Sequence, residues 1–148
     1  MENKDVEMIN ELRGDSRKKL SEISKAIGVP TTTLFYKLKR HEKETIKKYS
    51  SLLNYKKCGW NCHVNLFINV KEGMCEVFRK YVVESKHVNS AYVLKEGGFC
   101  LELVFVDELE LQVFVKDTLR AYGVVSIEEF HLIEEIKLES MVIPWKDH

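Results

Sequence analysis

The sequence predicts an α+β fold made of two domains. Residues 5 to 43 carry apolar side chains at the three- and four-residue spacing of amphipathic helices. From residue 62 onward, stretches with the alternating pattern of strands are interleaved with stretches at helical spacing. A chain of 148 residues is long enough for a small domain joined to one of medium size. We therefore expect a helical domain at residues 1–45, a hinge or linker strand at 46–61 and a mixed domain at 62–148.

The first helix is expected at residues 5 to 13, and Gly14 ends it. One side of this helix is apolar and carries Val6, Met8, Ile9 and Leu12. That side is suited to cover a core formed by two further helices.

A helix-turn-helix is expected at residues 20 to 43. Each of its two helices has one apolar face, formed by Leu20, Ile23 and Ile27 and then by Leu34 and Leu38. Gly28 can adopt the positive φ that ends the first of these helices. Pro30 prevents that helix from continuing, and Thr31 is expected to cap the next one with its side-chain oxygen. The result is a three-helix, winged-helix-like unit.

The outward face of the last of these helices is the candidate binding surface. A helix turns by 100° per residue, so the positions opposite its apolar face can be identified. They carry hydroxyl, phenol and cationic groups and no carboxylate: Thr32, Thr33, Tyr36, Lys39 and Arg40. Such groups bind base edges and phosphates in the major groove of DNA. The alternative is a solvated face of an ordinary helical hairpin. His41 lies on the inward face of the same helix, where its ring is expected to fill the core.

Charge is divided unevenly along the chain. Basic and acidic side chains number 23 each, so the formal net charge is zero. Residues 1 to 57 nevertheless carry 14 basic and 8 acidic side chains, whereas residues 58 to 148 carry 9 and 15. This asymmetry is expected of a nucleic-acid-binding module joined to a domain that does not touch nucleic acid. Candidate phosphate contacts flank the motif: Arg17, Lys18 and Lys19 before it, and Lys47, Lys48, Lys56 and Lys57 after it.

The mixed domain begins with a strand and a helix. Residues 62 to 70 alternate, and one side of this strand is apolar, with Val64, Leu66, Ile68 and Val70. Residues 72 to 84 return to helical spacing, with an apolar stripe of Val77, Phe78, Tyr81 and Val82.

A hairpin and a second helix follow. Strands are expected from Val88 and from Phe99, because a Gly-Gly pair between alternating runs is a strong hairpin signal. Residues 107 to 120 are expected to be helical, with an inward side of Leu109, Val113, Phe114 and Leu119. Gly123 leads into a last strand. The order βαββαβ predicts a ferredoxin-like domain, a four-stranded antiparallel sheet with both helices on one face.

The second face of that sheet has no helix to cover it. Residues 99 to 106 are apolar on both sides of the strand, and Glu102 is their one charged residue. Such a strand must bury its second side, and another copy of the chain is the simplest cover. The segment 138–145 is read as one more strand, which Pro144 restricts to an edge or an end.

Short motifs follow one another in the helical domain: Asp5 with Met8 and Ile9, then Asp15-Ser16-Arg17, then the run from Leu20 to Pro30. With the order of elements, these motifs make nearly the whole chain resemble the Lrp/AsnC family of bacterial and archaeal transcription regulators. The resemblance implies a homodimer, or a tetramer or octamer, that binds palindromic operators in double-stranded DNA. It also implies a C-terminal domain that assembles the oligomer and often senses an amino acid.

The resemblance places an effector site at Gly97, Gly98, Cys100 and Glu129. The effector loop of the family normally reads Gly-x-Tyr-Asp, and in this sequence Cys100 replaces the Asp. Glu129 stands where a later strand commonly has Thr near the ligand. A site that holds an ammonium and a carboxylate needs a specific partner for each group. We therefore expect an effector other than an ordinary amino acid, or none.

No metal, cofactor or catalytic site is expected. The run Cys58-x3-Cys62-His63 lacks the Cys-x2-Cys spacing and the second ligand pair of a zinc ribbon. The sequence contains no nucleophile elbow, phosphate loop or paired acid/base motif. It has neither a long apolar run nor a signal-peptide core, so a cytoplasmic protein with its four cysteines as thiols is expected.

Two alternative functions stay open. Siroheme decarboxylases are similar to this family in fold and size, and they have turned the effector cleft into a tetrapyrrole site. Such an enzyme needs basic residues in the C-terminal half, which is acidic in this chain. An architectural DNA binder of low specificity is the other alternative, and a small gap between specific and non-specific affinity would identify it.

Overall fold

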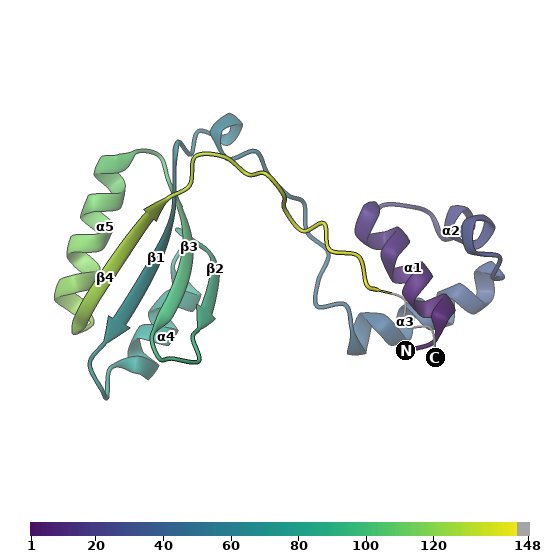
Figure 1. Ribbon diagram of the computed structural model, residues 1–148, viewed down its shortest axis with the longest axis horizontal. Coiled ribbons are helices and arrows are strands. Elements are labelled where there is room, and N and C mark those ends of the chain that lie inside the picture. Colours follow the sequence, from purple (N-terminus) through teal and green to yellow (C-terminus); the bar gives the residue numbers. More distant parts are fainter. Residues whose placement is uncertain (145–148) are drawn as a thin grey trace. The chain divides into compact units, whose positions relative to one another are not determined.

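The computed structural model describes residues 1–144, and the chain separates into two compact units (Figure 1). The helical unit joins Met1–Leu52 with the C-terminal segment that begins at Ile136. The sheet unit spans Leu53–Glu135. Within the described residues, no helix has both the length and the apolar character that crossing a membrane requires.

Three helices build the helical unit: α1 (Asn3–Gly14), α2 (Leu20–Ile27) and α3 (Thr31–Glu44). Their buried apolar side chains form one cluster of Met8, Ile9, Leu12, Ile23, Ile27 and Leu34. Leu20 and Leu38 are partly buried against this cluster. The structure thus confirms the three predicted helices and their apolar faces.

The turn between α2 and α3 has the expected helix-turn-helix geometry. Gly28 has a φ of 68°, and its N–H donates to the carbonyl of Ser24 at 2.9 Å, which ends α2. The N–H of Leu34 donates to the carbonyl of Pro30 at 3.0 Å. The predicted cap by Thr31 is wrong, and no side-chain hydrogen bond caps this end of the described helix. Thr31 is the first helical residue, and a capping side chain belongs to the residue before it.

The described part of the C-terminal segment lies against α1. The Asn10 side chain accepts from the N–H of Ile143 at 2.9 Å and donates to the carbonyl of the same residue at 3.1 Å. Arg13 donates to the carbonyl of Met141 at 2.7 Å. The predicted extra strand is wrong for residues 138–144, because side chains of α1 bind this backbone in place of a neighbouring strand. Residues 136–144 accordingly belong to the helical unit, and not to the mixed domain as predicted.

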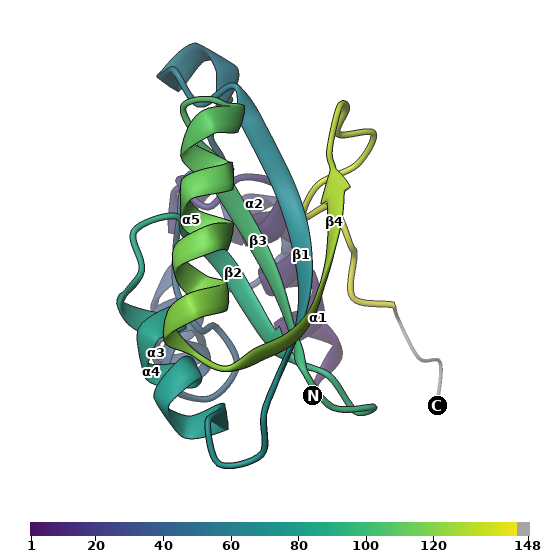
Figure 2. The same cartoon turned by 90° about the vertical axis from the view of Figure 1, so that its left-hand side faces the viewer.

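Residues 46–54 contain neither helix nor strand, so the linker has no strand there. The sheet unit begins with a short 3-10 helix, η1 (Lys56–Cys58), and continues as β1 (Cys62–Val70), α4 (Cys75–Glu84), β2 (Val88–Val93), β3 (Phe99–Phe105), α5 (Glu108–Ala121) and β4 (Val124–His131). The strand order is β2-β3-β1-β4, with every neighbouring pair antiparallel. Both helices cover one face of the sheet (Figure 2). The predicted ferredoxin-like order is therefore confirmed.

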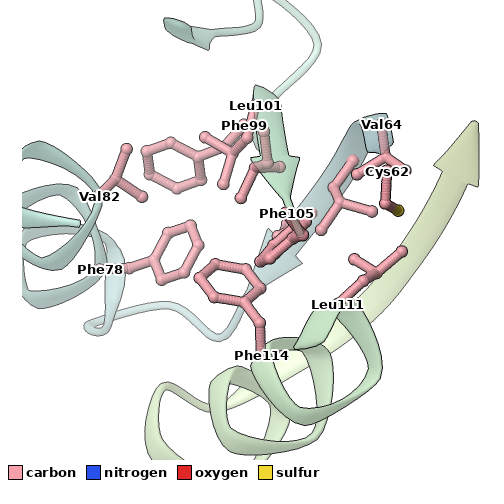
Figure 3. Packing of buried hydrophobic residues seen from close by; sticks show 12 residues of the cluster. Cys62, Val64, Phe78, Val82, Phe99, Leu101, Phe105, Leu111 and Phe114 are labelled. Atoms are coloured by element: carbon pink, nitrogen blue, oxygen red, sulfur yellow. The ribbon is translucent and has the colours of Figure 1, made fainter. Parts of the chain in front are cut away.

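The core of the sheet unit lies between the sheet and its two helices (Figure 3). Val64, Leu66 and Ile68 of β1 are at most 1% exposed, as their alternation predicts. Aromatic rings fill the space between the sheet and the helices, and Phe78 lies edge-on to Phe99 with ring centroids 4.9 Å apart. This packing fixes which face of the sheet the helices cover.

The buried stripe of α5 differs from the predicted one. Leu109 and Val113 are 73% and 52% exposed, whereas Leu111 is fully buried and Phe114 is nearly so. The side chain of the fourth predicted residue, Leu119, lies outside the described part. Apolar residues occur on several sides of this helix, so spacing alone does not select the inward one. Val77 of α4 is likewise exposed, at 52%, although it was expected to be inward.

The β2–β3 hairpin turns at Gly97 and Gly98, as predicted. Gly98 has a φ of 84°, and a Cβ at this position would lie 2.3 Å from Oδ1 of Asn69. Only glycine combines this backbone conformation with such a close approach. The pair is therefore required by the turn itself.

Candidate nucleic-acid interface

The outward face of α3 carries four of the five predicted binding side chains free of the core. Thr32 and Thr33 are exposed in its first turn, and Tyr36 is 73% exposed one turn later. The side chain of Lys39 is 59% exposed, and its ammonium lies 3.3 Å from the carboxylate of Glu42. Because such a solvent-exposed ion pair is weak, Lys39 can readily leave Glu42 and bind another anion. This surface offers two hydroxyls, a phenol and an amine.

Phe35 belongs to the same surface, although it is not among the predicted binding residues. Its side chain is 47% exposed and lies edge-on to Tyr36, with ring centroids 5.7 Å apart. The ammonium of Lys39 lies 5.7 Å from the centroid of the Phe35 ring. Helical spacing places Phe35 beside the apolar face of α3, so only the structure shows that it is exposed.

Arg40, the fifth predicted residue, contacts α1. One guanidinium nitrogen lies 2.7 Å from Oδ2 of Asp5, a carboxylate whose residue is only 1% exposed. Lys37 donates to the other oxygen of Asp5 at 2.8 Å, and Nε2 of His41 lies 3.4 Å from Oδ2. A cluster of three basic side chains of α3 thus surrounds one buried acid of α1. We call these four residues the Asp5 network.

The Asp5 network holds its carboxylate in the charged form. Burial raises the pKa of Asp5, but the hydrogen bond and charge of Lys37 and the charges of His41 and Arg40 outweigh burial and lower the pKa below its ordinary value. Arg40 therefore holds α3 against α1, in contrast to the free, groove-facing guanidinium that the sequence predicts. A sequence signal exists for this role, because Asp5 stands three residues before Met8 on the apolar stripe of α1.

His41 is 4% exposed, so the prediction that it faces the core is confirmed. Its Nδ1 lies 3.0 Å from the hydroxyl of Thr45. Both ring nitrogens thus contact polar groups within the helical unit. This side chain contributes to the position of α3 and is not available to a ligand.

The predicted phosphate contacts differ in their surroundings. Arg17, Lys47 and Lys48 are exposed in the helical unit. Lys18 makes an ion pair with Glu11 of α1, and this hydrogen bond raises the pKa of Lys18. Three of these four cations are thus free to approach a phosphate, while Lys18 first has to leave a carboxylate.

The structure does not bring the four predicted effector residues together. In the strand register, Cys100 pairs with Phe67 and Glu129 pairs with Leu66. Consecutive residues of a strand point to opposite faces, so Cys100 lies on the open face and Glu129 on the helix-covered face. A shallow hollow of about 260 Å³ lies beside Gly97, and its lining includes Glu128. The acid adjacent to the predicted one therefore borders this hollow.

The open face of the sheet combines aromatic and polar side chains. Phe67 and Phe130 lie edge to face, with centroids 5.5 Å apart. Next to them, Nε2 of His63 lies 2.8 Å from the Glu102 carboxylate, which also accepts from Asn89 at 2.9 Å. Burial raises the pKa of Glu102, but these hydrogen bonds and one from Ser90 outweigh burial and lower the pKa. Within the sheet unit, α4 and α5 both cover the other face and leave this one open.

The run Cys58-x3-Cys62-His63 does not form a cluster. His63 points to the open face toward Glu102, whereas Cys62 is buried on the helix-covered side with Val64. Alternation along β1 separates the two side chains.

No protein-family model and no curated protein matches this chain. Solved structures do. The transcriptional regulator NMB0573 of Neisseria meningitidis, in complex with L-Met, is 21% identical and has a TM-score of 0.87 over 97% of this chain and 96% of that one. An AsnC family transcriptional regulator from Agrobacterium tumefaciens is 20% identical, with a TM-score of 0.84 over 97% of each chain. B. subtilis LrpC is 20% identical, with a TM-score of 0.83 over 93% of this chain and 97% of that one. The chain thus has the fold of Lrp/AsnC regulators.

Proposed function

We propose that this protein is a sequence-specific DNA-binding transcriptional regulator of the Lrp/AsnC type. It binds palindromic operators as a homodimer or a higher oligomer. The observation that carries the proposal is the exposed face of α3, where Thr32, Thr33, Tyr36 and Lys39 stand clear of the core. The excess of basic residues in the first part of the chain and the fold shared with known regulators support it.

The four side chains suit the major groove in different ways. The Thr hydroxyls and methyls match base edges, including the methyl group of thymine. Tyr36 and Lys39 suit sugar and phosphate oxygens, which set the register of the helix on the duplex. Arg17, Lys47 and Lys48 are proposed as further phosphate contacts that raise affinity for any sequence. Arg40 is assigned to the position of α3, with no direct contact to a base.

The open face of the sheet unit is the proposed dimer interface. Phe130 is 49% exposed there and Tyr92 is 62% exposed, beside the half-buried ring of Phe67. A second copy placed on this face would bury these rings and shield the paired His63 and Glu102. Two copies related by a twofold axis would present two α3 helices to half-sites about 34–36 Å apart.

An ordinary amino acid is a poor fit to the hollow beside Gly97. The lining residues are Phe67, Ile68, Asn69, Leu94, Gly97, Phe99, Glu128 and Phe130. Glu128 can bind an ammonium group, but this lining has no basic side chain for a carboxylate. If an effector binds in this hollow, we expect it to be an amine without a free carboxylate.

Selection of bound fragments from the source genome tests the proposal directly. Purified full-length protein is incubated with sheared genomic DNA, and the retained fragments are sequenced and footprinted. We expect palindromic sites whose affinity falls steeply with salt, with a preference over random DNA of about 10³-fold or more. A preference near unity would instead identify an architectural binder, and no salt-sensitive retention of any duplex would refute DNA binding.

Variants on α3 and on the sheet unit then test whether DNA binds to α3. Thr33→Val should weaken binding to the selected site by about 1–3 kcal/mol if its hydroxyl contacts a base pair, whereas Tyr36→Ala should weaken binding to all sequences alike, as the loss of a sugar or phosphate contact does. Lys80→Ala, which removes an exposed cation from α4 of the sheet unit, is the matched control and should leave affinity unchanged. Equal losses in all three variants would remove α3 from the interface.

A further inference from the structure

Three side chains with metal-binding atoms converge at one end of the sheet unit. Cys62 begins β1, Glu108 is the first residue of α5, and His131 ends β4. Sγ of Cys62 lies 3.6 Å from Oε2 of Glu108, and the same oxygen lies 3.7 Å from Nδ1 of His131. All three donor atoms lie within 4.8 Å of one another. Elements far apart in the sequence thus supply one sulfur, one oxygen and one nitrogen to a single point.

Two of the three separations are close to the edges of a tetrahedral coordination shell. Zinc binds Cys sulfur at about 2.3 Å and His nitrogen or carboxylate oxygen at about 2.0–2.1 Å, so neighbouring ligands stand about 3.3–3.6 Å apart. The two measured edges, 3.6 and 3.7 Å, differ from these values by a few tenths of an ångström at most. The third separation, between the donor atoms of Cys62 and His131, is no more than 4.8 Å, and the Glu108 and His131 side chains are exposed enough to rotate.

The histidine of this cluster is already oriented as a ligand. Its Nε2 lies 2.6 Å from the Glu129 carboxylate, and its Nδ1 faces Glu108. A hydrogen bond from the distal ring nitrogen to a carboxylate fixes the tautomer and raises the basicity of the ligating nitrogen. Metal-bound histidines commonly have this arrangement. Glu129 therefore has a defined role here as an outer partner of the site.

Neighbouring acidic groups favour a cation at this point. Cys62 is 7% exposed, so a bound ion would have one side shielded from water. The carboxylates of Glu108 and Glu129 both lie beside His131 and would attract a cation. A divalent cation would replace the thiol proton and relieve the repulsion between Glu108 and the thiolate.

We propose that Cys62, Glu108 and His131 bind one divalent ion of the zinc class, with Glu129 orienting the histidine. A mixed sulfur, nitrogen and oxygen set suits Zn²⁺ and Co²⁺, whereas Mg²⁺ and Ca²⁺ prefer oxygen alone. Three protein ligands leave a fourth position for water or for a donor from a ligand. On binding, the thiol proton passes to solvent and a metal–thiolate bond forms. This inference does not depend on the DNA-binding function.

The test is metal titration of the full-length protein after chelator treatment and dialysis. Zn²⁺ is added in competition with a chromophoric chelator, and Co²⁺ is added separately while its visible and near-ultraviolet absorption is recorded. We expect saturation at one ion per chain, with the intense d–d bands of four-coordinate cobalt and a thiolate charge-transfer band. Saturation without the charge-transfer band would overturn the proposed ligand set.

Variants of the cluster distinguish the residues that bind the ion from those that only lie near it. Cys62→Ala should abolish the charge-transfer band, and Glu108→Gln and His131→Gln should weaken binding of both ions. Glu108 and His131 are partly exposed, so their variants should fold, and circular dichroism checks this. Glu129→Gln should weaken Zn²⁺ binding by about 10–100-fold while keeping the cobalt spectrum. Unchanged affinity in the Glu108 and His131 variants would overturn the proposal.

Matched controls use the remaining thiols and a second histidine. Cys58→Ser, Cys100→Ser and His63→Gln change residues outside the cluster and should keep the affinity and the spectrum of the parent protein. Loss of binding in Cys58→Ser or His63→Gln would point to the sequence-local run from Cys58 to His63 and would refute the site described here.

Discussion

The two units of this chain stabilise their interiors in different ways. In the sheet unit, Phe78, Phe99, Phe105 and Phe114 dominate a continuous apolar core between the sheet and two helices. In the helical unit, a smaller apolar cluster is joined by a buried carboxylate, Asp5, with three basic partners on α3. Apolar burial is non-directional and independent of pH, whereas ion pairs are directional and sensitive to protonation.

The difference corresponds to what each unit has to hold in place. The proposed DNA-binding role of α3 requires a fixed orientation of this helix relative to its neighbours, and the helical unit is small for a self-sufficient core. The Asp5 network connects α1 to the middle of α3 through Lys37 and Arg40. It therefore adds a directional constraint on α3 to the apolar packing of the cluster.

The largest effect is expected in the apolar core. Phe78→Ala should destabilise the sheet unit by about 3–5 kcal/mol, because Phe78 is fully buried against Phe99 and Tyr122. Val83→Ala, in the same helix at 79% exposure, should change stability by less than about 0.5 kcal/mol. Hydrogen exchange read by mass spectrometry reports each unit separately. If Phe78→Ala accelerated hydrogen exchange equally in both units, the division into two cores would be contradicted.

The second-largest effect on stability is expected in the Asp5 network. Asp5→Asn should destabilise the helical unit by about 2–3 kcal/mol, because the amide cannot neutralise the cations of Lys37 and Arg40. Glu44→Gln removes an exposed acid at the end of α3 and is the matched control, with little expected change. Denaturant-dependent hydrogen exchange of α1 to α3 gives the measurement. A loss confined to the sheet unit would show that the network does not stabilise α3.

A substitution on the open face of the sheet tests the proposed dimer interface. Phe130→Glu should dissociate the proposed dimer and weaken operator binding, because it places a charge beside Phe67 on the open face. Val83→Glu adds the same charge to the opposite, helix-covered side and should leave the oligomer intact. Sedimentation velocity distinguishes the outcomes. Dissociation by Val83→Glu alone would place the interface on the helices.

The sequence was sufficient to predict the order of elements. Alternation in β1 and β3, the helical spacing of α1 to α3, and the Gly97-Gly98 turn each have one physical reading, and the structure agrees with them. The orientation of α5 was not predictable in this way. Its buried residues, Leu111 and Phe114, compete with an exposed pair, Leu109 and Val113, of similar hydrophobicity.

The candidate sites were less predictable than the fold, because they depend on long-range contacts. Arg40 has the position of a groove-facing residue on a helical wheel, and only its contact with Asp5, 35 residues away, explains its orientation. Cys62 acquires Glu108 and His131 as neighbours only when β1, α5 and β4 are assembled. Local spacing carries no signal for the second cluster, and for the first it shows only that Asp5 lies on the apolar stripe of α1.

The pH dependence of stability should differ between the two units. The pKa of Asp5 is lower in the folded protein than its ordinary value of 3.8, so its contribution is fully present above that value. The contribution is lost as the pH falls through the folded-state pKa, because protonation removes the charge that binds Lys37 and Arg40. The stability gap between the parent protein and Asp5→Asn should therefore narrow in strong acid. A gap that stays constant from neutral pH to strong acid would contradict a charged Asp5.

The smallest effect distinguishes the two cations of α3. Lys39→Ala should lower the slope of log affinity against log salt by about 0.9 if its ammonium binds one phosphate. Arg40→Ala should leave that slope unchanged and lower the stability of the helical unit by less than about 1 kcal/mol, because its guanidinium is half exposed. Both variants remove one positive charge from the same helix, so each controls for the other. An equal fall in slope would mean that Arg40 leaves Asp5 to bind DNA, and the directional constraint on α3 would then rest on Lys37 alone.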